Sequence, residues 1–157
     1  MPEARPYQRV LALIDFDSTD ERIARKALLL ARLNRAQLAF LHLIEPDAAL
    51  DGGYPASGPK ADAAALETAA LRRLNFMSAQ LGAGEAECIA QFGPAHQAFK
   101  RKLQEWQPDL VVSAKDAHYL TGLHDLLILG QASRVGAGKT FKRLASWLSA
   151  KLQPASF

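Results

Sequence analysis

The chain has 157 residues, 49% of them hydrophobic and 22% charged, which is the balance of one globular domain and not of a disordered or low-complexity chain. Its single cysteine, Cys88, excludes a disulfide framework and a cysteine-rich zinc site. No apolar run approaches the roughly 18 residues of a membrane span, and the first residues lack the apolar segment of a secretion signal. We therefore expect a cytoplasmic protein without a transmembrane segment.

The net charge of +3 is distributed unevenly along the chain. No acidic residue follows Asp125, and several cations lie at or beyond Arg134, so that residues 1–133 carry a slight negative excess. A basic tail on a slightly acidic body argues against a nucleic-acid-binding surface on that body. We expect no specific nucleic-acid partner.

Buried strands and amphipathic helices alternate along the first 114 residues. Short, almost continuous apolar runs predict parallel strands at 10–16, 37–44, 86–92 and 109–114. Apolar residues at helical spacing predict helices that end near Asn34 and that cover 62–81 and 94–107, and 45–60 is predicted to be a loop. This order predicts an α/β fold with three αβα layers and a parallel sheet of four to five strands. Ligands of such sheets bind beyond the carboxyl ends of the strands.

The pattern is harder to interpret beyond Lys115. Residues 126–129 (LLIL) fit a short fifth strand, but 121–129 equally fit a loop that leads into a helix. The segment 133–140 (SRVGAGKT) nearly matches a phosphate-binding P-loop, yet it lacks the first glycine and no acidic partner follows. Amphipathic spacing over 141–152 predicts a basic helix. We predict one domain over 1–134 and a basic C-terminal helix within 135–157 that packs on it.

Few residues of the chain are candidates for chemistry. Asp15 ends the first strand, where a carboxylate can meet a ribose or a base, or can cap the next helix; Asp17 competes for that cap. His42 lies within a buried strand and is interpreted as a core histidine. The other histidines have no partner at metal-ligand spacing. We predict no catalytic residue and no metal site.

Three stretches of sequence resemble the universal stress protein family. They are YQRVLALIDFDST, LAFLHLIEPD and FGPAHQAFKRKLQEWQPDLVVSA, within residues 7–114. The resemblance implies a Rossmann-like fold with a five-stranded parallel sheet in the order 3-2-1-4-5. It also implies a homodimer, and in many members ATP binding. It favours the interpretation in which 121–129 form a phosphate loop leading into a helix.

The resemblance also indicates which residues would meet a nucleotide. Asp15 and Leu43 would contact the adenosine. The family's phosphate loop, Gly-x2-Gly-x9-Gly-Ser/Thr, is matched by alanines at its first two glycines, by glutamine at its hydroxyl residue, and with a longer spacing; the aligned residues are Ala114, Ala117, Gly130 and Gln131. The chain thus resembles the subgroup that does not bind ATP. We expect a non-catalytic stress-response protein without a cofactor that acts through a protein partner or as a weak ligand sensor. The alternatives are an ATP- or AMP-binding module and a regulatory protein that uses the basic helix.

Overall fold

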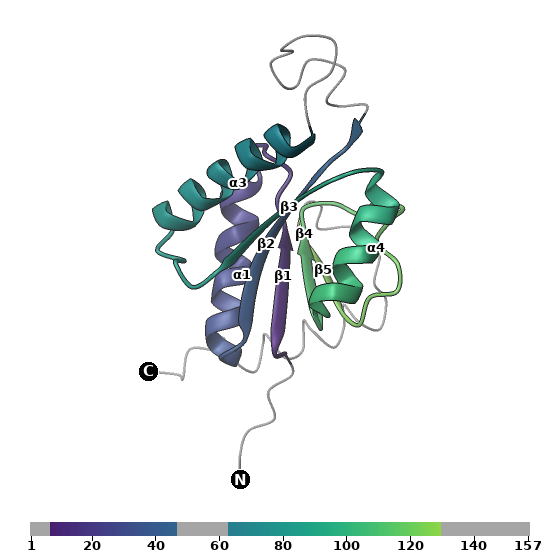
Figure 1. Ribbon diagram of the computed structural model, residues 1–157. Coiled ribbons are helices and arrows are strands. Elements are labelled where there is room, and N and C mark those ends of the chain that lie inside the picture. The colour runs from purple at the N-terminus through teal and green to yellow at the C-terminus, as the bar shows by residue number, and fades with distance from the viewer. Residues whose placement is uncertain (1–6, 47–62, 130–157) are drawn as a thin grey trace, which may run out of the picture.

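The computed structural model describes residues 7–46 and 63–129, which fold around one parallel sheet (Figure 1). Its strands are β1 (Arg9–Leu13), β2 (Gln37–Ile44), β3 (Glu87–Phe92), β4 (Leu110–Ser113) and β5 (Leu126–Ile128). They lie in the order β3-β2-β1-β4-β5, and every neighbouring pair is parallel. The predicted fold class and strand order are confirmed.

Three described helices form the outer layers. α1 (Asp20–Asn34) and α3 (Ala63–Gln80) cover one face of the sheet, and α4 (Ala95–Trp106) covers the other (Figure 1). Right-handed crossovers explain this arrangement, since β1, β2 and β3 advance in one direction and the chain then returns past β1 to β4. The helices on the two faces of the sheet contact different residues of the same strands. Successive side chains of a strand point to opposite faces.

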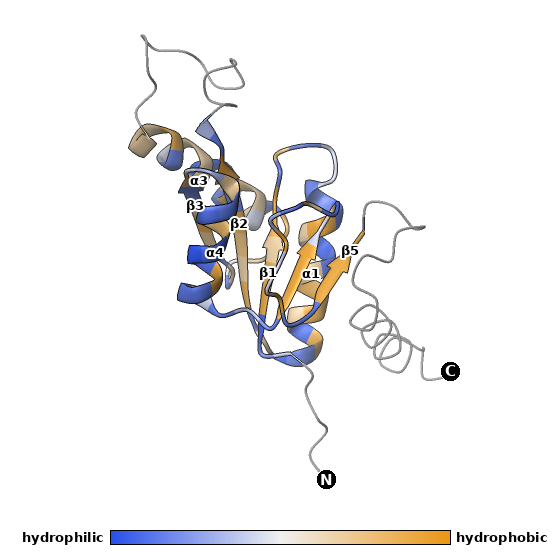
Figure 2. Ribbon diagram, turned by 90° about the vertical axis from the view of Figure 1, so that its right-hand side faces the viewer, coloured by the Kyte–Doolittle hydropathy of each residue, from blue (hydrophilic) through white to orange (hydrophobic). Residues whose placement is uncertain are grey.

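That alternation divides the core into two clusters. On β1, Val10 and Ala12 pack on the α1 face, and Leu11 and Leu13 pack on the α4 face. The inner strands are accordingly the most hydrophobic part of the molecule, whereas the helices are mixed in hydropathy (Figure 2) and leave Leu29, Leu33 and Phe76 exposed. Burying one such large side chain contributes about 1.5–3 kcal/mol. These apolar strands fix the register that brings the carboxyl ends of β1, β2 and β4 together.

β5 overturns the interpretation that we favoured for residues 121–129. Instead of a phosphate loop leading into a helix, Leu126–Ile128 pair with β4, with Val111 opposite Leu126. All three β5 residues are buried by this pairing. The crossover from β4, residues 114–125, reaches β5 as a loop that contains no helix. β4 is therefore an inner strand and not the edge of the sheet.

A polar clamp holds the opposite, amino end of the sheet. The Asp109 carboxylate accepts hydrogen bonds from the backbone N–H groups of Gln8 and Arg9, both at 2.8 Å. The Arg9 guanidinium stacks over the Trp106 ring at 4.1 Å, and its Nε donates to the Trp106 carbonyl. The clamp joins β1, β4 and the end of α4, and so keeps β1 and β4 in register.

Several predictions fall on residues that the structure does not describe. They concern Gly130, Gln131, the segment 133–140 and the helix over 141–152. The packing of residues 135–157 on the domain also lies outside the described residues. Within 7–46 and 63–129, no helix has the length and apolar character needed to cross a membrane.

Candidate functional site

The candidate site lies at the carboxyl ends of β1, β2 and β4. Here the strand order reverses, because the chain passes from β1 to β2 on one side and β4 lies on the other. Asp15 comes just after β1 and is half-buried. Leu13 is paired with Leu41, so extending the register by two residues places Asp15 level with Leu43. The two residues expected at the adenosine thus lie at the same edge of the sheet.

The environment of Asp15 is unfavourable for its negative charge. Burial raises its pKa, and the nearby carboxylates of Asp17 and Asp20 raise it further. The Lys115 ammonium acts in the opposite direction. The Asp15 carboxyl group therefore lies in a partly desolvated environment that contains other acidic side chains.

Asp17, and not Asp15, accepts the hydrogen bonds that form the turn before α1. Its Oδ1 accepts hydrogen bonds from the backbone N–H of Thr19 at 2.9 Å and from the Thr19 hydroxyl. These bonds lower the pKa of Asp17. Asp20 Oδ1 accepts from the Asp17 N–H at 3.2 Å, which closes the turn. This arrangement leaves Asp15 free of a capping role.

A stack of three side chains holds the turn that carries Asp15. The Phe16 ring lies on His42 at 3.7 Å, and the Arg73 guanidinium lies over Phe16 at 4.3 Å. Phe16 has a φ of 60°, which is unusual for a bulky residue and is held here by the stack. His42 Nδ1 donates to the Ile14 carbonyl at 2.7 Å, and burial lowers the pKa of His42. The prediction of a hydrogen-bonded core histidine is confirmed.

The two residues aligned with the first glycines of the phosphate loop, Ala114 and Ala117, are built into the domain. Ala114 directly follows β4, is 5% exposed, and packs in the cluster under α1. The Ala117 carbonyl accepts from the Leu120 N–H at 3.0 Å, which closes a turn. Neither alanine has a positive φ. The Ser113 hydroxyl donates to the Lys115 carbonyl at 2.8 Å and so closes the beginning of the crossover.

Tyr119 is a residue at this site that the sequence did not point to. It stands in the crossover, is half-buried, and meets the Phe99 ring edge-on at 5.4 Å. Burial raises the pKa of Tyr119 to about 12, and the charges of Asp15 and Glu45 add to the effect. Its phenol thus lies near the carboxylates that end β1 and β2. No local sequence pattern indicates that a tyrosine in a loop faces a residue about a hundred positions earlier.

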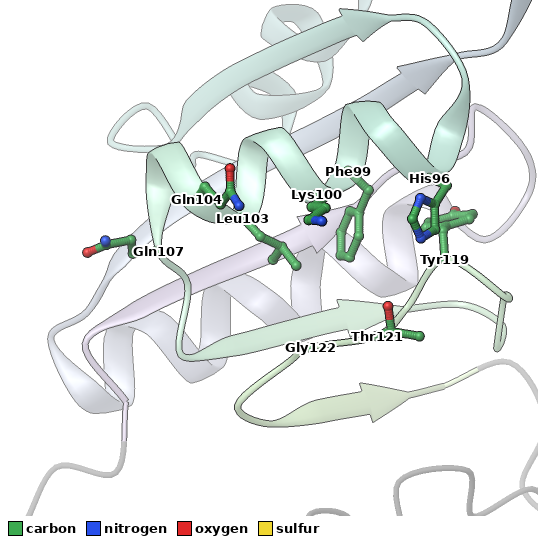
Figure 3. Close-up of a pocket in the computed structure, with 9 residues that line it drawn as sticks. All are labelled: His96, Phe99, Lys100, Leu103, Gln104, Gln107, Tyr119, Thr121 and Gly122. Atoms are coloured by element: carbon green, nitrogen blue, oxygen red, sulfur yellow. The ribbon is translucent and has the colours of Figure 1, made fainter.

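A separate pocket opens between α4 and the crossover. Its volume is about 410 Å³, and the residues around it come from the flank of α4 and from residues 119–122 (Figure 3). Neither Asp15 nor Leu43 lines it. Tyr119 lines this pocket and also lies near Asp15, so it stands between the two sites. Among the described residues, no group of three or more histidine, cysteine, aspartate or glutamate side chains could hold a metal ion.

The fold and the site define a class of protein. A doubly wound parallel sheet with polar residues at the carboxyl ends of its inner strands is the architecture of α/β proteins that bind ligands at that edge. The family model described as the universal stress protein family matches residues 6–137, so the chain belongs to this family. No curated protein matches the chain.

Solved structures of universal stress proteins are similar to this chain at low sequence identity. A universal stress protein family member from Burkholderia pseudomallei is 16% identical with a TM-score of 0.53, over 82% of this chain and 100% of that one. UspA from Lactobacillus plantarum is 19% identical with a TM-score of 0.48, over 95% and 94%. A universal stress protein solved in complex with cAMP is 23% identical with a TM-score of 0.46, over 68% and 71%.

Proposed function

We propose that this protein is a cytoplasmic stress-response protein that catalyses no reaction and acts through a protein partner or by weak ligand sensing. It does not hold ATP as a tightly bound cofactor. The supporting observation is the closed crossover after β4. Ala114 is part of the core, and Ala117 closes a turn. A phosphate site needs backbone N–H groups that converge on an open concavity, and the N–H groups of Lys115, Leu120 and Thr121 are instead hydrogen-bonded within this loop.

The negative charge at the carboxyl ends of the strands also disfavours ATP binding. Asp17 and Asp20 lie close enough to Asp15 to raise its pKa, and Lys115 is the cation that offsets them. A triphosphate would bring several negative charges to this acidic edge. Phosphate groups bind where cations and converging N–H groups outnumber carboxylates. The strand ends therefore suit an uncharged or weakly charged ligand better than ATP.

Calorimetric titration tests this proposal. The purified chain is titrated with ATP, AMP and cAMP, with and without Mg²⁺, and incubation with ATP and Mg²⁺ is followed by an assay for released phosphate. We expect no tight ATP binding and no phosphate release above the buffer control. A dissociation constant for ATP in the low micromolar range or tighter would contradict the proposal. So would phosphate release that the variant Asp15→Asn abolishes.

The alternative is a module that binds ATP or AMP through its adenosine. The level placement of Asp15 and Leu43 supports it. AMP then binds more tightly than ATP, because AMP brings fewer charges to the acidic edge. Asp15→Asn should weaken AMP binding, whereas Asp17→Asn, at the same turn, should not weaken it, because it removes one charge from the acidic edge and its amide oxygen can still accept the bonds from Thr19. AMP binding that responds equally to both substitutions rules out a specific adenosine site.

We further propose a homodimer, the assembly that is common in the family. Within the described residues, β3 and β5 are the outer strands of the sheet, and an outer strand leaves backbone groups free to pair with a second chain. Sedimentation velocity tests this proposal. A single species with the mass of one chain at all concentrations contradicts it.

A further inference from the structure

The pocket between α4 and the crossover owes its existence to the connection between β4 and β5. In a parallel sheet this connection is usually a helix that packs beside its neighbour. Here residues 114–125 cross as a loop, and Tyr119, Leu120 and Leu123 press onto the sheet. The flank of α4 beside the loop is therefore left facing a groove, which Figure 3 shows between α4 and residues 119–122.

The lining of this pocket combines an apolar wall with basic side chains. Phe99 and Leu103 of α4 and Tyr119 of the crossover form the apolar part. Phe99 and Tyr119 meet edge to face at 5.4 Å, so the wall is aromatic. Two basic side chains line the pocket, Lys100 and His96, both of them exposed, and no carboxylate lines it.

Uncharged polar side chains complete the lining. Gln104 stands one helical turn beyond Lys100 on α4, and Thr121 lies across from α4 in the crossover (Figure 3). Ligand sites of small molecules have volumes of about 300–1,000 Å³, an apolar body and a few polar groups that fix orientation. The pocket meets this description, with its volume of about 410 Å³ near the lower end of the range.

We propose that this pocket binds a small aromatic monoanion, such as an aryl carboxylate. The aromatic ring lies against Tyr119 and Leu103, and the anionic group pairs with the Lys100 ammonium. One ammonium matches one negative charge. This site is distinct from Asp15 and Leu43, and its existence does not depend on the proposed function.

Calorimetric titration of the full chain with naphthoate tests the proposal, with naphthylmethanol as an uncharged probe of the same shape. We expect naphthoate to bind more tightly than naphthylmethanol. Lys100→Gln should weaken naphthoate binding by about two- to fivefold, the strength of an exposed ion pair, and should leave naphthylmethanol unchanged. Arg101→Gln is the matched control, because Arg101 is the next cation of α4 and does not line the pocket. It should alter neither probe.

A second variant blocks the pocket without changing its charge. Thr121 is exposed at the rim, so Thr121→Trp should fill the groove and reduce naphthoate binding at least tenfold. Circular dichroism and the melting temperature show whether the variant is folded, and the surface variant Lys100→Gln tests the proposal in any case. The proposal is overturned if naphthoate does not bind, if naphthylmethanol binds equally well, or if Arg101→Gln weakens naphthoate as much as Lys100→Gln. Unchanged binding to a folded Thr121→Trp variant also overturns it.

Discussion

Replacing Tyr119 by phenylalanine tests how the crossover covers the carboxyl ends of the strands. Burial, assisted by the charges of Asp15 and Glu45, raises the pKa of the Tyr119 phenol from 10 to about 12. The folded protein therefore keeps this phenol neutral at pH values where the unfolded chain ionises it. Stability from this group is fully present below about pH 10, the pKa in an unfolded chain, and is lost as the pH rises towards 12. Phenylalanine cannot ionise, so the variant lacks this loss.

The size of the effect follows from the shift. Each pKa unit corresponds to about 1.4 kcal/mol, so two units give an upper limit of about 2.7 kcal/mol. Tyr119 is only half-buried, and solvent screens its interactions with the carboxylates. We therefore expect the free energy of unfolding of the wild type to fall by about 1 kcal/mol relative to Tyr119→Phe between pH 9 and pH 11.

Urea denaturation of both proteins across this pH range measures the difference. The near-ultraviolet absorbance of tyrosinate follows the same ionisation directly. The Tyr119 contribution is the part of this signal that the wild type shows and Tyr119→Phe lacks. Asp15→Asn should lower the pKa of Tyr119, but by less than burial raises it, because the Asp15 charge is the smaller cause. The reasoning is refuted if Tyr119 titrates near pH 10, or if the two proteins lose stability in parallel.

Three further predictions concern stability and assembly. Asp109→Ala removes the acceptor of the exposed Gln8 N–H and of the half-buried Arg9 N–H and should lower the free energy of unfolding by about 1–2 kcal/mol, measured in urea. A loss no larger than that of an ordinary surface substitution speaks against the clamp. Asp15→Asn should raise the melting temperature at pH 7, because burial raises the pKa of Asp15 and the wild type loses stability as the pH rises through that pKa. The gain should disappear under acidic conditions, where Asp15 is protonated in both the folded and the unfolded chain. A gain that persists there disproves this cause. Deleting residues 139–157 should reduce solubility or change the hydrodynamic size. Within the described residues β5 is an outer strand, and the deleted sequence predicts an amphipathic helix that could cover it. An unchanged size and melting temperature would exclude a structural role for residues 139–157.

Much of the fold follows from local sequence, and the reason lies in the sheet. Strands buried on both faces consist of continuous apolar residues, so β1 can be predicted from its own sequence without knowledge of the strands that pair with it. The position of Asp15 and Leu43 at one edge of the sheet follows as well, because parallel strands present their carboxyl ends there.

The crossover could not be predicted in the same way. Three residues are too few for a periodic pattern, and β5 forms because Leu126 and its neighbours find β4 as a partner. Tyr119 and the pocket follow from that pairing, since the loop presses onto the sheet only when β5 is in place. Resemblance to relatives that have a phosphate loop at this point favoured the wrong alternative.

The central claim is that the crossover, folded as a loop onto the sheet, takes the place of a phosphate site. Its most direct test restores both glycines in the double variant Ala114→Gly, Ala117→Gly and titrates it with ATP and Mg²⁺ by calorimetry beside the wild type. We predict that neither protein binds ATP tightly, because the β5 pairing, Tyr119 and the acidic strand ends remain in place. Binding by the double variant in the low micromolar range would show that two Cβ atoms alone exclude the nucleotide, and would contradict the account.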